Sequence, residues 1–249
     1  MDEETIVFAS KSYMRHLVAQ TNEYPFLYKY CSFEGGYSML SAMNIQFTRA
    51  DKLNDEDEIN LSKTNIESHL ELLREADIPE SVISSKLEEA KSFFGGIGIC
   101  SCGKTAHNKK LWENYASSDG IENGICIEIS QKMVIDYLLS KGIKAIALLV
   151  HYFDNVSNIL PWDLFLGNTL ERQIFLQLLY TSKLRSKWAE EDEVRLVYSE
   201  PFTGTHFRPL LSSKCITSVF YGRDMTKSQR IKIGKILNRY KHIKRIMTH

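Results

Sequence analysis

Short runs of apolar, β-branched and aromatic residues recur along this chain, and they alternate irregularly with segments of helical periodicity. A regular strand–helix repeat would favour a parallel, doubly wound sheet. The irregular order favours instead an α+β fold, in which helices flank a mixed, mainly antiparallel sheet. The predicted strands are 27–30, 45–48, 98–102, 124–129, 145–153, 193–199 and 215–221, with a turn at Gly35–Gly36. The predicted helices are 37–43, 108–116, 132–139, 162–181 and 226–240.

The length of 249 residues fits one large domain or two small ones. Neither an internal repeat nor a linker rich in Pro, Gly and Ser divides the chain. Within residues 60–93 we predict two amphipathic helices, because Thr64 and Glu67 form a capping box and Pro79 suits a helix's first turn. We therefore expect a single domain over 1–249 with a helical insertion near 60–93.

Charge is balanced overall but not locally. The 31 Lys and Arg equal the 31 Asp and Glu, which argues against a general nucleic-acid coat. Residues 51–91 hold 12 acidic and 5 basic residues, a charge of −7. Residues 223–249 hold 9 Lys and Arg against Asp224 alone, a charge of +8. These segments are either solvated helix surfaces that attract each other, or the basic one faces phosphates or nucleic acid.

The composition predicts an intracellular protein. The longest uninterrupted apolar run, 145–150, has six residues, far below the ~20 that span a bilayer. The first residues are acidic, unlike a secretory signal, and five cysteines is an odd number for a disulfide framework. We therefore expect a cytoplasmic location, reduced thiols and no membrane association. The seven histidines have no metal-ligand spacing, so no metal site is predicted.

The most informative stretch runs from Trp188 to Val197. In a strand, the period of two would place Glu191, Glu193 and Arg195 on one face. The guanidinium would hold one carboxylate ionised, while the like-charged neighbour would raise the pKa of the other. Such a pair could bind a ribose hydroxyl or stabilise an oxocarbenium-like sugar. The alternative is a salt-bridge ladder on an edge strand.

Two polar segments are further candidates. Asn54 and Asp55 follow an apolar strand, where they suit a turn or helix cap, and Asp55 with Glu58 could instead bind a cation or a substrate hydroxyl. Ser101 lies between two cysteines of a predicted strand, and it could position a nucleotide hydroxyl. Cys-x-Cys is a poor zinc spacing, which favours buried thiols.

Trp112 and Tyr115 share one face of the predicted helix 108–116. Aromatic residues at this spacing usually belong to the core. Beside a polar pocket, they could also stack on a nicotinamide or adenine ring.

Taken in order, these segments resemble a widespread, mostly bacterial family of a domain of unknown function. The resemblance covers about 200 residues and includes the substitution of Glu56-Asp57 for the family's Pro-Phe. The matching motifs are Leu27-Tyr28-Lys29-Tyr30, Asn54-Asp55-x-x-Glu58, Ser101, Leu111-Trp112-x-x-Tyr115-Ala116, Gly124-x-Cys126-Ile127, Trp188-x-x-Glu191-x-Glu193-x-Arg195 and Val219-Phe220-Tyr221-Gly222.

The layout is more distantly similar to that of ADP-ribosyltransferases, which carry a polar residue on a first strand, a Ser or Thr on a middle strand and Glu-x-Glu late in the chain. This resemblance implies that Glu193 binds the ribose 2′-hydroxyl, that Glu191 orients the acceptor, that Ser101 braces Glu193, and that Tyr28 or Lys29 contacts NAD. The predicted catalytic residues are Glu193, Glu191 and Arg195, and the predicted NAD-binding residues are Tyr28, Lys29, Asn54, Asp55, Ser101, Trp112 and Tyr115.

Three functions follow as hypotheses. The first is an NAD-dependent mono-ADP-ribosyltransferase acting on a protein or nucleic acid; the resemblance suggests a toxin or anti-phage defence. The second is a non-catalytic sensor or protein-interaction module, which would bind a partner protein. The third is a Mg²⁺-dependent hydrolase or nuclease that uses Asp55, Glu58, Glu191 and Glu193.

Overall fold

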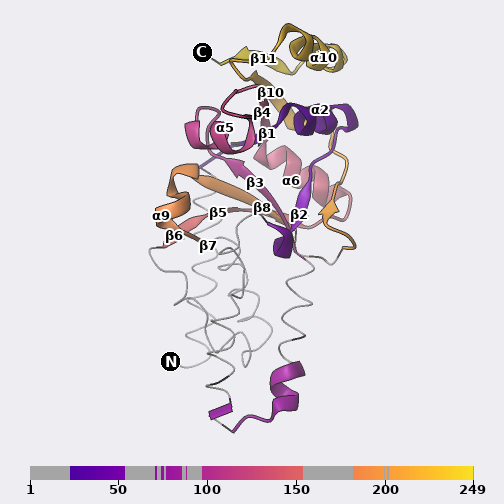
Figure 1. Ribbon diagram of the computed structural model, residues 1–249. Helices are drawn as coiled ribbons and strands as arrows, with labels where there is room; N and C mark the ends of the chain where they lie inside the picture. Colours follow the sequence, from indigo (N-terminus) through magenta and orange to yellow (C-terminus); the bar gives the residue numbers. More distant parts are fainter. Residues whose placement is uncertain are drawn as a thin grey trace.

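The computed structural model describes residues 23–53, 71, 74–75, 77–85, 88, 97–153, 182–198, 200 and 202–248. These residues form an α+β fold, in which helices flank a mostly antiparallel open sheet (Figure 1). Most of the predicted insertion near 60–93 and all of the predicted helix 162–181 lie outside the described residues. Within 60–93, residues 80–85 are helical. None of the described helices is long and apolar enough to cross a membrane.

One half of the sheet is built around β1 (Phe26–Cys31). It pairs along its whole length with the antiparallel β4 (Ile125–Ser130). β10 (Ile216–Tyr221) lies on the far side of β4, also antiparallel. β11 (Lys244–Met247) closes this edge and runs parallel to β10.

The other half is built around β3 (Gly98–Gly103). One edge of β3 pairs over all six residues with β8 (Glu193–Tyr198), and β8 in turn pairs with β5 (Ala145–Leu149). Both pairings are antiparallel, and every residue of β8 is buried between them.

The second edge of β3 is shared by two strands. β1 meets β3 only through Tyr28 and Gly103, at the end of β3, whereas β2 (Phe47–Arg49) pairs with its beginning. β9 (His206–Phe207) continues the sheet beyond β2. Because β1 and β2 leave β3 at opposite ends, the sheet is split between them.

Three helices cover one face of the sheet: α2 (Phe33–Ala42), α6 (Gln131–Ser140) and α10 (Lys227–Leu237). Their apolar faces pack on the main core, which includes Leu40, Val134, Ile233 and the β1 residue Leu27. α5 (Lys109–Tyr115) covers the other face, where Tyr30, Leu111, Trp112, Cys126 and Phe220 form a second cluster. The alternation of Leu27 and Tyr30 along β1 thus separates two apolar layers.

α2 begins four residues earlier than predicted, because Ser32 caps it by accepting a hydrogen bond from the Gly35 backbone N–H. The predicted turn at Gly35–Gly36 is therefore wrong. Gly36 lies where α2 crosses β4, and a Cβ atom there would lie 2.4 Å from the side chain of Ile125. Gly36 therefore allows close packing of the helix on the sheet.

The predicted strand 145–153 is two strands, β5 and β6 (His151–Phe153), and β6 pairs in parallel with β7 (Ser182–Leu184) in a separate small sheet. The remaining short helices are α9 (Arg185–Trp188), η1 (Ala50–Lys52), η3 (Ala189–Glu191) and η4 (Ser213–Cys215).

Candidate functional site

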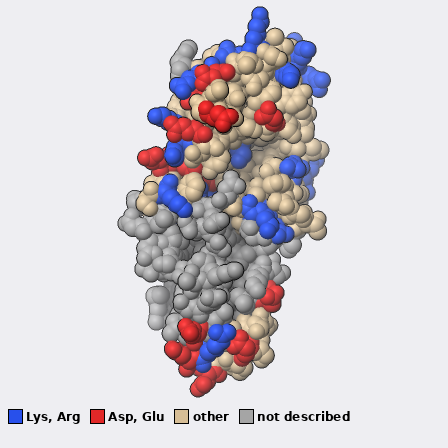
Figure 2. All heavy atoms as spheres, viewed as in Figure 1, with Lys and Arg blue, Asp and Glu red and all other residues tan. Residues whose placement is uncertain are grey.

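A polar cleft of about 560 Å³ lies where β1 and β2 diverge, bounded by α2, β3, α5 and α9. In the view of Figure 2 the surface is hollowed over these elements, and Lys and Arg atoms lie within and beside the hollow. Four cationic side chains line the cleft: Lys29, Lys52, Lys183 and Arg208. None of the described residues that line it carries a carboxylate. The cleft therefore presents a positive potential to an anionic ligand.

Two of these cations are held in place by hydrogen bonds within the cleft wall. The Lys29 ammonium donates to the Ser101 carbonyl oxygen at 2.9 Å, and Arg208 Nε donates to the Gln46 side chain at 2.9 Å. The indole Nε1 of Trp188, another lining residue, is buried without a hydrogen-bond partner among the described residues. A buried donor of this kind is rare and is commonly satisfied by a ligand or water.

Behind the cleft wall lies a buried cluster of two carboxylates and two cations. The Lys183 ammonium bridges Glu191 at 2.9 Å and Glu193 at 2.7 Å. Arg195 Nε donates to Glu193 at 2.9 Å, and Arg195 Nη2 donates to it at 3.3 Å. These four side chains are between 0 and 4% exposed. Their formal charges cancel, so attraction within the cluster offsets the cost of removing each ion from water.

Neutral hydrogen bonds complete the coordination of Glu191. The Tyr115 hydroxyl donates to its Oε1 at 3.0 Å, and the Asn114 amide donates to the same oxygen at 3.1 Å. Lys183 also lies over the Trp188 ring, 4.7 Å from its centroid, as a cation–π contact. Both neutral donors of Glu191 are on α5, so α5 ties the carboxylate to the cleft.

The carboxylates around Lys183 favour the charged form of its ammonium group. Burial lowers the pKa of Lys183, but the charges of Glu193 and Glu191 raise it by more, so the ammonium is retained at neutral pH. Burial raises the pKa of the Tyr115 phenol, and the neighbouring Glu191 raises it further. Tyr115 is therefore a neutral hydrogen-bond donor to Glu191.

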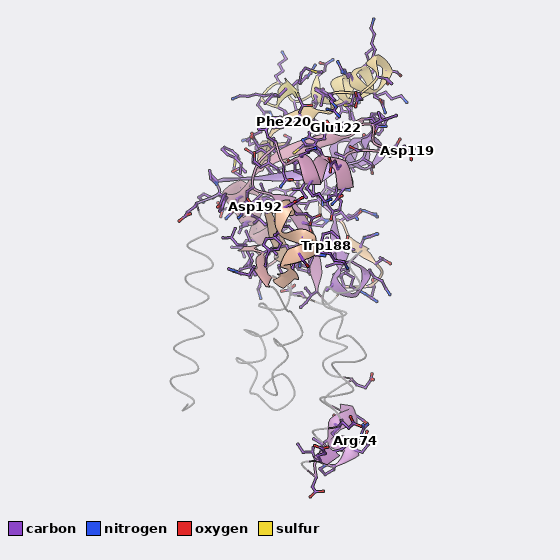
Figure 3. The ribbon with its side chains drawn as sticks, turned by 60° about the vertical axis from the view of Figure 1, so that its left-hand side comes forward. Arg74, Asp119, Glu122, Trp188, Asp192 and Phe220 are labelled. Carbon is purple, nitrogen blue, oxygen red and sulfur yellow. The ribbon has the colours of Figure 1, made fainter. Side chains whose placement is uncertain are left out.

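The predicted placement of Glu191 in a strand is wrong. Glu191 ends η3, and Asp192 turns the chain with a φ of 45° before Glu193 begins β8. The Asn108 amide fixes this bend by donating to the carbonyl oxygens of residues 190 and 191 at 2.8 and 2.9 Å. Figure 3 shows Asp192, at the bend, and Trp188, just before η3, in the part of the molecule away from Phe220 and Glu122. The carboxylates meet through Lys183, not through strand periodicity.

A small chamber of about 30 Å³ reaches the carboxylates. Glu191 and Glu193 border it, and it shares Lys29, Ser101 and Tyr115 with the lining of the cleft. A volume of this size holds one water molecule or one hydroxyl group. The cleft thus places a large cationic space beside a small acidic one.

The structure brings together part of the predicted site. Lys29, Ser101 and Tyr115 line the cleft, and Glu191, Glu193 and Arg195 lie directly behind it. Ser101 contributes its carbonyl oxygen and pairs in register with Arg195, so the expected brace from Ser101 to Glu193 is replaced by Arg195 and Lys183. Asn54 and Asp55 lie outside the described residues.

Tyr28 and Trp112 do not line the cleft. The Tyr28 hydroxyl donates to Glu128 at 3.0 Å on the other face of β1. The Trp112 indole donates to the Ala106 carbonyl oxygen at 2.8 Å, and its ring packs edge-on against Tyr30 in the core beneath α5. Both rings pack in the second apolar cluster, so the cleft lining does not include these two predicted residues.

Sequence reasoning missed Lys183, Asn114, Arg208 and Tyr152. The Tyr152 hydroxyl accepts from the Glu193 backbone N–H at 2.8 Å. Lys183 is one of three cations at alternate positions in the segment 182–188. No pattern in the sequence distinguishes it from the other two as the buried one. Asn114 adjoins the predicted residue Tyr115, so of the four it was the easiest to predict from the sequence.

Among the described residues, no group of three or more His, Cys, Asp and Glu could hold a metal ion, and Asp55 and Glu58 lie outside them. Comparisons with protein-family models, curated proteins and solved structures found no match for this chain. The function is therefore inferred from the geometry of the cleft.

Proposed function

We propose that the protein binds NAD in the cleft and transfers its ADP-ribosyl group to a macromolecule. One observation carries the proposal: a cation-lined cleft adjoins a hydroxyl-sized chamber that Glu191 and Glu193 border. The cleft volume of about 560 Å³ lies within the range of small-molecule sites. Phosphate oxygens favour Lys and Arg, and a carboxylate favours the electron-poor sugar that forms when a glycosidic bond breaks.

The two phosphates of NAD would lie along Lys29 and Arg208, and a hydroxyl of the nicotinamide ribose would enter the chamber. In the reaction, the bond between ribose C1′ and the nicotinamide nitrogen breaks, and its electron pair leaves with neutral nicotinamide. A nucleophilic atom of the acceptor then bonds to C1′ and releases its proton to solvent. Glu193 would stabilise the positive charge that develops at C1′.

Lys183 and Arg195 would keep the carboxylates oriented throughout this step. Both are buried and form ion pairs with Glu193, so their positions depend little on solvent. Preorganised charge of this kind avoids reorganisation as the transition state forms. Trp188 Nε1 would donate to an acceptor atom of the bound ligand.

The test is release of nicotinamide from NAD by the purified protein, with and without cell lysate as a source of acceptor. We expect Glu193→Gln to lower the rate by ~10²-fold or more, the magnitude typical of a lost electrostatic contact to the transition state. Glu113→Gln is the matched control, because Glu113 of α5 is far more exposed than Glu193, and it should leave the rate unchanged. Equal rates in the parent and in Glu193→Gln, with equal melting temperatures, would refute the mechanism.

A second candidate is a non-catalytic module that binds the same ligand. It is favoured by the complete pairing of the carboxylate oxygens, which is also what a purely structural network requires. If NAD raises the melting temperature of the parent protein but no nicotinamide appears even with lysate, the binding module is the better account.

A further inference from the structure

The end of the molecule formed by α10 and β11 carries a dense positive charge. Residues 223–245 hold nine Lys and Arg and a single acidic residue, Asp224. Figure 2 shows Lys and Arg atoms projecting from this end, at the top of the view. Of the nine cations, Arg223 forms ion pairs, with Glu122 and Asp224, both at 3.4 Å. No ion pair within 4 Å involves the other eight among the described residues.

The arrangement of these charges on α10 works against the helix itself. Lys227 and Arg230 lie in its first turn, at the positive end of the helix dipole, where the structure has no acidic residue. Lys227 and Arg230 are three residues apart, and so are Lys232 and Lys235, so like charges are neighbours on the helix surface. Local stability does not explain this pattern.

Two of the other described helices each pair a lysine with an acid. On α5, Lys109 lies 3.6 Å from Glu113, and on α6, Lys132 pairs with Asp136, both at four-residue spacing. The same chain therefore uses stabilising opposite-charge pairs on α5 and α6 and repulsive like-charge neighbours on α10. A surface that tolerates repulsion gains when a polyanion neutralises it.

α10 and Arg245 of β11 also border a shallow, open groove. Its volume is about 360 Å³, and its lining includes Lys227, Arg230, Lys235 and Arg245. Gly234 lies at the middle of α10 on this side, and a Cβ atom there would meet nothing nearer than Arg245 Nη1 at 3.8 Å. None of the described lining residues is acidic.

We propose that this groove and the surrounding cations bind the phosphate backbone of a double-stranded nucleic acid. A protein partner is less suited to the surface, because the cores of protein interfaces are depleted of charge, whereas interfaces with nucleic acid are strongly cationic. Neither α10 nor β11 contains an aromatic residue, so they offer no stacking platform for unpaired bases. Recognition through phosphates alone is independent of sequence.

The test measures binding of a fluorescent duplex of ~20 base pairs by anisotropy between 50 and 200 mM salt, where backbone binding is most salt-dependent. DNA and RNA duplexes of one sequence form separate arms, and NAD is absent, so the result does not depend on the proposed enzyme activity. The variant combines Lys227→Gln, Lys235→Gln and Arg245→Gln. The control combines Lys109→Gln, Lys132→Gln and Lys144→Gln, which removes the same charge from exposed sites elsewhere.

We expect the groove variant to bind at least ~10-fold more weakly at 50 mM salt and the slope of log K against log salt to fall by about one per removed cation. The control variant should bind as the parent does, and the melting temperatures of all three should agree. Equal weakening by both variants would mean that binding depends on net charge and not on this groove, which would overturn the proposal. Tighter binding of a single strand, or equal binding of polyglutamate of matched charge, would also overturn the proposal.

Discussion

Lys183 is the residue on which the candidate site depends most, because its ammonium contacts both buried carboxylates. Without it, Glu191 would keep only neutral donors, and Glu193 would keep Arg195 alone. Removal of one partner from a buried ion pair leaves an uncompensated charge, which costs far more than the pair itself contributes.

We predict that Lys183→Ala lowers the free energy of unfolding by ~3–5 kcal/mol. The measurement is equilibrium denaturation by urea. Lys132→Ala, at an exposed lysine that also pairs with an acid, is the control and should have almost no effect, since water screens exposed pairs. Similar losses in the two variants would mean that the buried cluster does not act as an electrostatic unit.

At this scale, sequence reasoning could find residues with strong local context and missed those without it. Glu191, Glu193 and Arg195 stand within seven residues of Trp188, and all three belong to the buried cluster. Lys183 lies on β7, and it is buried because β7 pairs with β6, a strand remote from it in sequence. No periodicity encodes such a contact.

At the scale of elements, two helix glycines separate the effect of close packing from the effect of helix propensity. Gly36 of α2 and Gly234 of α10 both lie within helices, but of these two only Gly36 closely approaches another element. A Cβ atom at Gly36 would lie 2.4 Å from Ile125, whereas at Gly234 the nearest atom would be 3.8 Å away. The same substitution should therefore have opposite effects at the two positions.

We predict that Gly36→Ala destabilises the protein by ~1–3 kcal/mol, the usual range for overpacking in a core. Gly234→Ala should stabilise it by up to ~1 kcal/mol, because alanine favours the helix and meets open space. Thermal unfolding of the two variants measures both effects in one experiment. Stabilisation by both would place α2 farther from β4 than the structure has it.

Most strands and helices were predictable because they carry local signals. The predicted helices 108–116 and 226–240 match α5 and α10, which Asn108 and Thr226 cap. The predicted strand 193–199 matches β8 closely. The bend at Asp192 was not predictable, because its left-handed φ belongs to a non-glycine residue that Asn108 and the ion pair with Lys104 hold.

At the scale of the whole molecule, the cleft arises because two strands share one edge of β3. β1 meets the end of β3 and β2 meets its beginning, and the space between them becomes the cationic cleft. Pairing between strands far apart in sequence leaves no trace in either strand alone. The α+β class was therefore predictable from the sequence, while the split that creates the site was not.

Titration calorimetry of the whole protein with NAD tests whether NAD binds in this cleft. We predict that Lys29→Ala weakens binding ~10-fold or more, since a lost charge-assisted contact is worth about 1.5–3 kcal/mol. Lys109→Ala, at a solvent-exposed lysine outside the cleft lining, should bind NAD as the parent does. Equal affinity of both variants for NAD, or no heat of binding in the parent, would contradict the claim.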